Sequence, residues 1–411
     1  MQSWCAYVSL WANALSTILR RYPLRHGRGV PSVLGMPSTT IDLLRRLVAF
    51  PTVSRTSNLE LQQWLGEQLE ACGAQVQVLP GVAEGRANLL ATIGPKVPGG
   101  VLLSAHTDVV PPGEGWCTDP FALTLDGDRW YGRGSADMKG FLAVVLSVLG
   151  TVDPATLRAP VHVLGSYDEE VGCQGVRDVL PVLGVDASVR PELVVIGEPT
   201  MMRPRHSHLG KQMHRLVVRA AEAHSSRAAT APSAIAGAAE LVQALSAVQT
   251  GCPLAGPGEA PAYTVNCGTI RGGTAANVIA AECELVFEVR HGVDHDPDEV
   301  LRPFWAVVDA VHHRLVAVGG GVERHLITAY PAMATDVMSP AFAAAVRLAD
   351  TGASQALDFG TEGGLLAEVI DAPVMICGPG DIGDAHRPDE SVSVDQLERC
   401  EKFVRQLIEH F

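Results

Sequence analysis

Short, mostly apolar runs alternate with amphipathic segments along most of the chain. Apolar residues recur at helical spacing over 58–73 and 136–150. Continuous apolar runs that end in turn residues or ionisable side chains occupy 101–108, 159–170, 192–199 and 372–386. Such runs are typical of strands buried on both faces, with the intervening helices covering them. The pattern therefore predicts an α/β domain with a mostly parallel sheet flanked by helices.

The pattern changes between residues 207 and 321. Strand-like runs at 213–220, 262–270, 281–290 and 323–330 alternate with helical patterns at 232–248 and 297–315. The order β-α-β-β-α-β is that of a ferredoxin-like unit. We therefore predict an inserted α+β domain at 207–321, between the two parts of a larger domain at 36–206 and 322–411.

The first 35 residues do not fit this organisation. Their apolar stretch is too short to span a bilayer, and no basic region precedes it as it would in a signal sequence. A Ser/Thr-capped helical pattern begins shortly after Met36. We predict that 1–35 is a non-native or dispensable extension.

Composition narrows the class of protein. The 411 residues are too many for one ordinary core, and 47% of them are hydrophobic. A net charge of −14 without a basic cluster disfavours nucleic acid as a partner, and we expect no membrane association. The nine cysteines include no C-x-x-C pair, which favours a reduced, cytoplasmic protein and disfavours thiolate zinc ligation.

Histidine and carboxylate side chains follow the predicted strands. Because parallel strands place their carboxyl ends at one edge of a sheet, these side chains should share one acidic cleft. The set comprises His106, Asp108, Glu169, Glu170, Glu198 and His386, joined by Asp137 at the start of a helix. Clustered carboxylates repel one another unless cations neutralise them, and oxygen and nitrogen ligands suit zinc or cobalt. The number of ligands favours two ions sharing a carboxylate.

Simpler interpretations exist for each of these residues alone. A single histidine at a strand end is most often structural, and Glu169 and Glu170 could instead cap the following helix. The agreement of four strand ends is what favours a metal site.

Five motifs resemble the dinuclear zinc amidohydrolase and peptidase family: "SAHTDVVPP", "GRGSADMKG", "YDEEVG", "IGEPT" and "GDIGDAHRPDE". They occur in the family's order and cover nearly the whole chain from about Met36. The family includes acetylornithine deacetylase, succinyl-diaminopimelate desuccinylase, aminoacylase and carboxypeptidase G. The segments "LDFGTEGGLL" and "CGPGDIGDAHRPDES" are most similar to acetylornithine deacetylases.

The resemblance implies two zinc ions, with cobalt as an alternative, held by His106, Asp137, Glu170, Glu198 and His386. Asp137 corresponds to the bridging carboxylate, and Asp108 to the carboxylate that orients His106. Glu169 corresponds to the general base, which takes a proton from the water that bridges the metals and passes it to the departing amine.

The resemblance also implies a lid and dimerisation role for 207–321. His224 would reach the partner subunit's active site and stabilise the oxyanion. Contacts to the substrate would come from Asn277, Arg290, Thr361 and Glu362, with Arg290 suited to the α-carboxylate. The chain departs from the family pattern mainly in the lid, which leaves the substrate open.

The function implied is hydrolysis of an N-acyl-L-amino acid by a cytoplasmic homodimer. The first expected substrate is N-acetyl-L-ornithine, giving L-ornithine and acetate in arginine biosynthesis. N-acetylcitrulline deacetylase, aminoacylase and metallo-carboxypeptidase activities are alternatives. A non-catalytic metal-binding homologue is an alternative of another class, although Glu169 argues against it because such a relative would be free to lose the base.

Overall fold

The computed structural model describes residues 39–411 apart from 186–188, 254–261, 353 and 358. The extension predicted at 1–35 lies outside these residues. Among the described helices, none is both long and apolar enough to cross a membrane.

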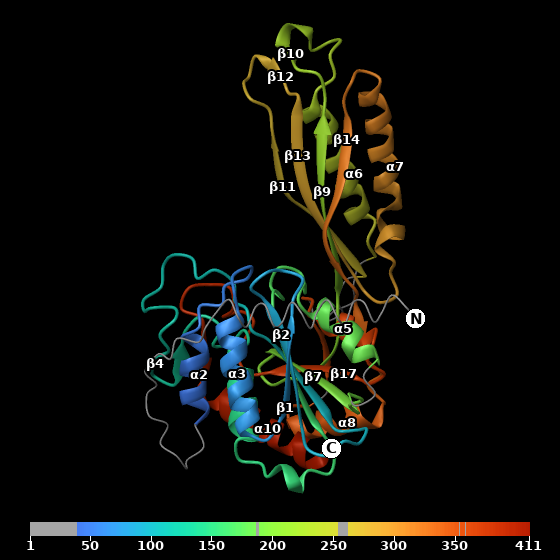
Figure 1. Ribbon diagram of the computed structural model, residues 1–411. Coiled ribbons are helices and arrows are strands. Elements are labelled where there is room, and N and C mark those ends of the chain that lie inside the picture. The colour runs from blue at the N-terminus through green and yellow to red at the C-terminus, as the bar shows by residue number, and fades with distance from the viewer. Residues whose placement is uncertain (1–38, 186–188, 254–261, 353, 358) are drawn as a thin grey trace, which may run out of the picture. The chain divides into compact units, whose positions relative to one another are not determined.

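A nine-stranded mixed sheet forms the larger part of the structure (Figure 1). Its four central strands, in the order β6-β3-β7-β17, are parallel to one another, and antiparallel strands extend it on both sides. The predicted α/β class is therefore confirmed, with parallel pairing concentrated at the centre. The strands are β1 (Gln75–Pro80), β2 (Ala87–Ile93), β3 (Val101–His106), β6 (Val161–Ser166), β7 (Leu193–Pro199), β8 (Arg205–His208), β15 (Met333–Ala334), β16 (Gln355–Leu357) and β17 (Val374–Gly378).

Helices cover both faces of this sheet. Successive residues of β3 enter two separate apolar clusters, because successive side chains of a strand point to opposite faces. Leu103 lies in the first cluster and Leu102 in the second. The first cluster includes α2 (Thr40–Val48), α3 (Leu59–Ala71), α4 (Lys139–Leu149), α8 (Pro340–Ala349) and α10 (Val394–His410). The second includes α5 (Val176–Val185) and α9 (Gly363–Ala367). The interior of this sheet is therefore largely apolar on both faces.

A separate four-stranded antiparallel sheet has the order β11-β13-β9-β14 (Figure 1). Its helices, α6 and α7, pack on one face around a third apolar cluster. The chain order is β9 (Gly210–Arg219), α6 (Ala234–Thr250), β11 (Tyr263–Gly272), β13 (Glu282–His291), α7 (Pro297–Val316) and β14 (Gly321–Tyr330). This confirms the predicted inserted ferredoxin-like unit, and the pairing of β14 with β9 extends its sheet to Tyr330.

Two smaller sheets complete the described secondary structure. β4 (Thr124–Asp126), β5 (Arg129–Tyr131) and β18 (Ser391–Ser393) form one, and β10 (Ala223–His224) pairs with β12 (Val278–Ile279) in the other. Short 3-10 turns lie at Pro154–Thr156 and Ser225–Arg227.

Candidate metal centre

The predicted ligands meet at the carboxyl edge of the central parallel strands. His106 is the last residue of β3, Glu198 is near the end of β7, and Glu170 follows β6 by four residues. Asp137 lies two residues before α4, in the turn that begins with the glycine-rich "GRGS". The parallel arrangement brings these distant segments together, as open parallel sheets generally do.

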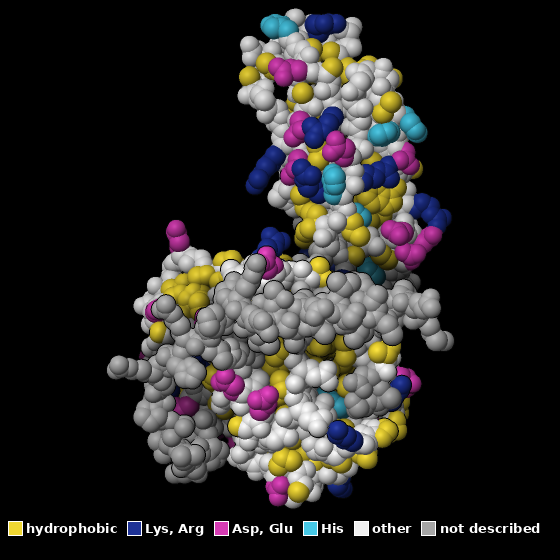
Figure 2. Space-filling model, in the orientation of Figure 1, with side chains coloured by type: hydrophobic (Ala, Val, Ile, Leu, Met, Phe, Trp, Pro, Cys, Tyr) yellow, Lys and Arg dark blue, Asp and Glu magenta, His cyan; other side chains and the backbone are white. Residues whose placement is uncertain are grey.

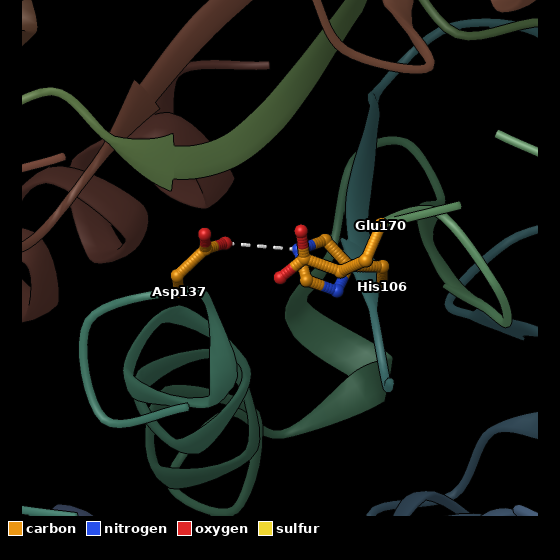
Figure 3. Close-up of side chains that lie close together, drawn as sticks. All are labelled: His106, Asp137 and Glu170. Carbon is orange, nitrogen blue, oxygen red and sulfur yellow. Dashed lines mark hydrogen bonds and ion pairs between the residues drawn. The ribbon is translucent and has the colours of Figure 1, made fainter. Parts of the chain in front are cut away.

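Two groups of donor atoms share His106. The ligand atoms of His106, Asp137 and Glu170 lie within 4.8 Å of one another, and so do those of His106, Glu169 and Glu198. Figure 3 shows the first group, with His106 Nε2 3.0 Å from Asp137 Oδ1. The other Asp137 oxygen, Oδ2, is 3.1 Å from Nε2 of His386. Asp137 thus offers one oxygen to each histidine, which is the placement that a bridging carboxylate requires.

Asp108 orients residues of the cluster without belonging to either donor group. His106 Nδ1 is 2.9 Å from the backbone carbonyl of Asp108, so an Nδ1–H donated there leaves Nε2 directed at the cluster. The Asp108 carboxylate accepts hydrogen bonds from Ser54 Oγ at 2.7 Å and from the backbone N–H of Glu169 at 3.0 Å. The ring is therefore oriented through the carbonyl, while the carboxylate fixes the turn that carries the two glutamates.

The pKa values of the cluster residues are shifted because negative charges are crowded together. Burial and neighbouring carboxylates raise the pKa of Glu169 to about 8 and that of Glu170 to about 7. Burial also raises the pKa of Glu198 well above its usual value, with the Asp137 charge as the next cause. Hydrogen bonds to Asp137 and Glu170 raise the pKa of His386 to about 10. Without cations the cluster therefore retains protons that metal ions would displace.

The donor set fits divalent ions. It consists of carboxylate oxygens and imidazole nitrogens, and the two histidine rings flank a shared carboxylate. Cys173 is the cysteine beside the cluster, and it is buried with Sγ 3.2 Å from Glu169 Oε1. Oxygen and nitrogen ligands without thiolate suit zinc or cobalt, and the structure leaves the identity of the metal open.

The cluster opens into a cavity of about 450 Å³. Its inner lining consists of Asp137, Glu169, Glu170, Glu198 and His386. Its outer lining comes from the four-stranded sheet and from loops, and includes Arg55, Lys211, Met213, Arg290, Thr328, Tyr330, Phe359 and Ile382. A cavity with metal donors on one side is large enough for a small amide substrate.

Comparison with known proteins identifies the chain. The model for peptidase family M20/M25/M40 matches residues 102–410. The chain belongs to this family. The predicted resemblance is thus confirmed, and the family's metallo-hydrolase chemistry agrees with the donor set of this M20 chain.

Individual relatives agree with this assignment. Acetylornithine deacetylase from Proteus mirabilis is 33% identical over 91% of this M20 chain and 97% of its own length. The structure of an M20 metallo-carboxypeptidase from Sulfolobus solfataricus superposes with a TM-score of 0.75, at 18% identity and with 90% and 99% of the two chains covered. That of a dinuclear metal-binding M20 peptidase from Bacillus subtilis has a TM-score of 0.64 at 17% identity, covering 90% and 96%.

The structure adds a buried ion pair that the sequence did not reveal. Arg133 and Glu390 are each 1% exposed, and Arg133 Nη1 lies 2.6 Å from Glu390 Oε2. The other Glu390 oxygen accepts the backbone N–H groups of Ala136 and Asp137, both at 3.0 Å. The pair therefore holds the turn that presents Asp137. In the sequence, the segment containing Arg133 has only the pattern of a turn. The one feature that could have drawn attention to Glu390 is its position four residues after His386 in "AHRPDE".

Asp168, the first acid of the "DEE" run, lies outside the cluster. It forms a buried ion pair with Arg86, and its Oδ1 accepts the backbone N–H of Arg55 at 2.6 Å. Arg86 also donates to the carbonyl of Arg55. Asp168 therefore fixes the turn that places Arg55 at the pocket.

The predicted substrate contacts occupy different places. Arg290 lines the cavity. Thr361 and Glu362 are buried outside its lining, and Glu362 accepts hydrogen bonds from Ser104 and Ser166 near the ends of β3 and β6. His224 and Asn277 are exposed in the β10–β12 region and do not line it either. Their predicted contacts stay predictions.

Proposed function

We propose that this M20 protein hydrolyses the amide bond of N-acyl-L-amino acids, with N-acetyl-L-ornithine as the first substrate to test. The observation that carries the proposal is the position of Glu169. Its carboxylate lines the pocket and lies in a donor group with His106 and Glu198. We assign it to proton transfer because Asp137, Glu170, Glu198 and the two histidines supply ligands without it. The acetylornithine deacetylase relative supports the choice of first substrate.

Two divalent ions, zinc or cobalt, would supply the positive charge that polarises the amide carbonyl and makes water nucleophilic. The proposed ligands are His106, Asp137, Glu170, Glu198 and His386, with Asp137 between the two sites. Asp108 keeps His106 in the required tautomer through its carbonyl.

Glu169 acts as the proposed general base. Its Oε1 lies 3.2 Å from Cys173 Sγ, which leaves Oε2 free to take a proton from the attacking water. The same carboxyl then delivers that proton to the nitrogen of the departing amine. The carboxylate is positioned by its own backbone N–H, which donates to Asp108.

The remaining features of the proposal concern the assembly. We place the chain in the cytoplasm as a homodimer joined through the four-stranded domain, the proposed lid. His224 and Asn277 lie together, with Ser225 N–H donating to the Asn277 carbonyl at 3.0 Å. Both would act on the tetrahedral oxyanion or on the substrate in a partner subunit.

The test is amine release from N-acetyl-L-ornithine by protein loaded with zinc or cobalt, with metal content measured on the same sample. Metal-free protein should be inactive, and activity should return with about two ions per chain. A panel of other N-acetyl amino acids, including N-acetyl-L-citrulline, separates deacetylases from broader aminoacylases. Metal-loaded protein that hydrolyses none of these substrates would overturn the proposal in favour of a non-catalytic metal-binding role.

A further inference from the structure

The charges that line the outer pocket all have the same sign. Apart from the donor cluster and its base, the charged residues among the described lining are Arg55, Lys211 and Arg290. No acidic residue joins them in that part of the described lining. The outer pocket is therefore cationic, whereas the cluster below it is anionic until it binds metal.

Lys211 and Arg290 face each other across two neighbouring strands. They are directly paired in the register of β9 and β13, so their side chains share one face of the four-stranded sheet. Glu288 lies between them, with Oε2 2.8 Å from Lys211 Nζ and Oε1 3.0 Å from Arg290 Nε. One carboxylate therefore serves two cations, and the group keeps a net positive charge.

The ion pairs on the rest of the same face leave no positive excess. Arg215 pairs with Glu284, and further along Arg219 pairs with both Glu282 and Glu323. Figure 2 shows basic and acidic side chains side by side over this sheet. The positive excess is thus confined to the end of the face that forms the pocket.

Arg55 adds a third positive charge from another part of the chain. Its backbone is held by Asp168 and Arg86, with a φ of 69°, and its side chain lines the pocket. The ion pairs identified among the described residues include none made by its guanidinium. Arg55 is therefore positioned by buried groups and free to contact a ligand.

We propose that the preferred substrate is an N-acyl amino acid that carries a second carboxylate in addition to its α-carboxylate. This inference rests on the proposed amide hydrolysis and specifies its substrate class. One carboxylate would be bound by the pair Lys211 and Arg290, and the other by Arg55. The ornithine side chain is itself a cation and would meet positive charges with no acidic partner in the described outer lining.

The second carboxylate could belong to the amino-acid side chain or to the acyl group. N-acetyl-L-glutamate against N-acetyl-L-glutamine tests the first, because the two differ in charge at nearly equal size. N-succinyl-L-alanine against N-butanoyl-L-alanine tests the second. The measurement is kcat/KM of the metal-loaded protein for these four compounds and for N-acetyl-L-ornithine.

We expect at least about a tenfold preference for the dianion in one of the two pairs, since a charged hydrogen bond is worth that much. N-acetyl-L-ornithine should be hydrolysed less efficiently than the preferred dianion. Equal or better turnover of N-acetyl-L-ornithine would overturn the inference and leave the proposed amidohydrolase intact. Absence of turnover for every N-acyl amino acid would overturn the proposed function and this inference with it.

Three variants test which residues determine the preference for the dianion. Lys211→Met should lower the dianion preference about tenfold, whereas Glu288→Gln should raise it, because the shared carboxylate no longer neutralises the two cations. Arg215→Met is the matched control, since Arg215 lies on the same strand and face but does not line the pocket. It should leave the preference unchanged. A preference that is the same in Lys211→Met as in Arg215→Met would contradict the assignment, and thermal melting of each variant checks that it folds.

The same pocket can be probed without turnover. Calorimetric titration of metal-loaded Glu169→Gln with the four compounds of both pairs measures binding directly. We expect tighter binding of the dianion, with an affinity that falls as salt increases. Equal dissociation constants for the dianion and its monoanionic partner in both pairs would overturn the inference.

Discussion

The two sheets of this protein bury their strands in different ways. All six residues of β3 in the nine-stranded sheet are buried, because helices cover both of its faces. In β13 of the four-stranded sheet, buried residues alternate with half-buried ones, because its helices cover one face only. The central strands of the first sheet therefore have their carboxylates only near or beyond the strand ends, whereas the second sheet carries charged groups along a whole face.

This difference separates two kinds of charge. At the strand ends, carboxylates are forced together out of water, so their pKa values rise and they need cations or buried partners. On the free face of the second sheet, charges remain partly hydrated and pair with one another at little cost. The first arrangement suits catalysis with metal ions, and the second suits selection of a ligand by charge.

The largest expected effect comes from removing the base at the strand ends. Glu169→Gln should lower kcat by about 10²–10⁴-fold while retaining metal, because the amide cannot take up a proton. Glu170→Ala should instead lose metal, since its carboxylate belongs to the donor group with Asp137 and His106. Activity assays and elemental analysis of the same samples check both. Equal metal loss from the two variants would contradict the division of roles.

A buried ion pair provides the next test of the comparison. Glu390→Gln keeps an acceptor for the amides of Ala136 and Asp137 but leaves Arg133 buried without a counter-charge. Unfolding should become about 3–5 kcal/mol easier, and metal affinity should fall with it. Denaturant titration measures the first effect and metal titration the second. A loss of less than about 1 kcal/mol would mean that the pair behaves like a surface one.

The pH dependence of metal binding is expected to be smaller but distinct. Two proposed ligands hold protons in the metal-free cluster. The pKa of Glu170 is raised to about 7 and that of His386 to about 10, so protons compete with metal below these values. Metal affinity should rise between pH 6 and pH 8, by about tenfold per pH unit for each proton displaced. Calorimetry in buffers of different ionisation enthalpy counts these protons. An affinity independent of pH in this range would show that these ligands are already deprotonated.

The smallest effect should come from the free face of the four-stranded sheet. Glu284→Gln removes the partner of Arg215, but the two side chains are 31% and 39% exposed. Its cost in unfolding free energy should be below about 1 kcal/mol, and high salt should reduce it further. Measured beside Glu390→Gln, the same chemical change would then have two different costs at a buried ion pair and at a partly exposed one. A similar cost for both would remove the contrast.

The prediction from sequence succeeded where local signals agree. The continuous apolar runs identified the central strands, and the switch near residue 207 identified the inserted unit with its strand and helix order. The acids and histidines after those runs were expected in one cleft, and the structure brings His106, Asp137, Glu170 and Glu198 together. The rule that parallel strands end at one edge made this possible without coordinates.

Contacts between distant residues were not accessible in the same way. Arg133 and Glu390 are 257 positions apart in the sequence, and Asp168 and Arg86 are 82 positions apart. Neither pair has a periodic pattern, because each depends on how separate loops pack around the strand ends. The contacts of Asp108 were equally inaccessible: His106 Nδ1 lies 2.9 Å from its backbone carbonyl and 3.6 Å from its Oδ1, and its carboxylate also accepts the N–H of Glu169.

By itself, the sequence determined the class of fold, the residues available as ligands, and the adjacent Glu169 and Glu170 with their separable expected roles. Only the tertiary structure decided which charges share a pocket. Lys211, Arg290 and Arg55 come from segments far apart in the chain, and a sequence does not reveal that Glu288 serves two of them. The reason is physical: burial and periodicity act over a few neighbouring residues, whereas the balance of charge in a pocket depends on distances that exist only after folding.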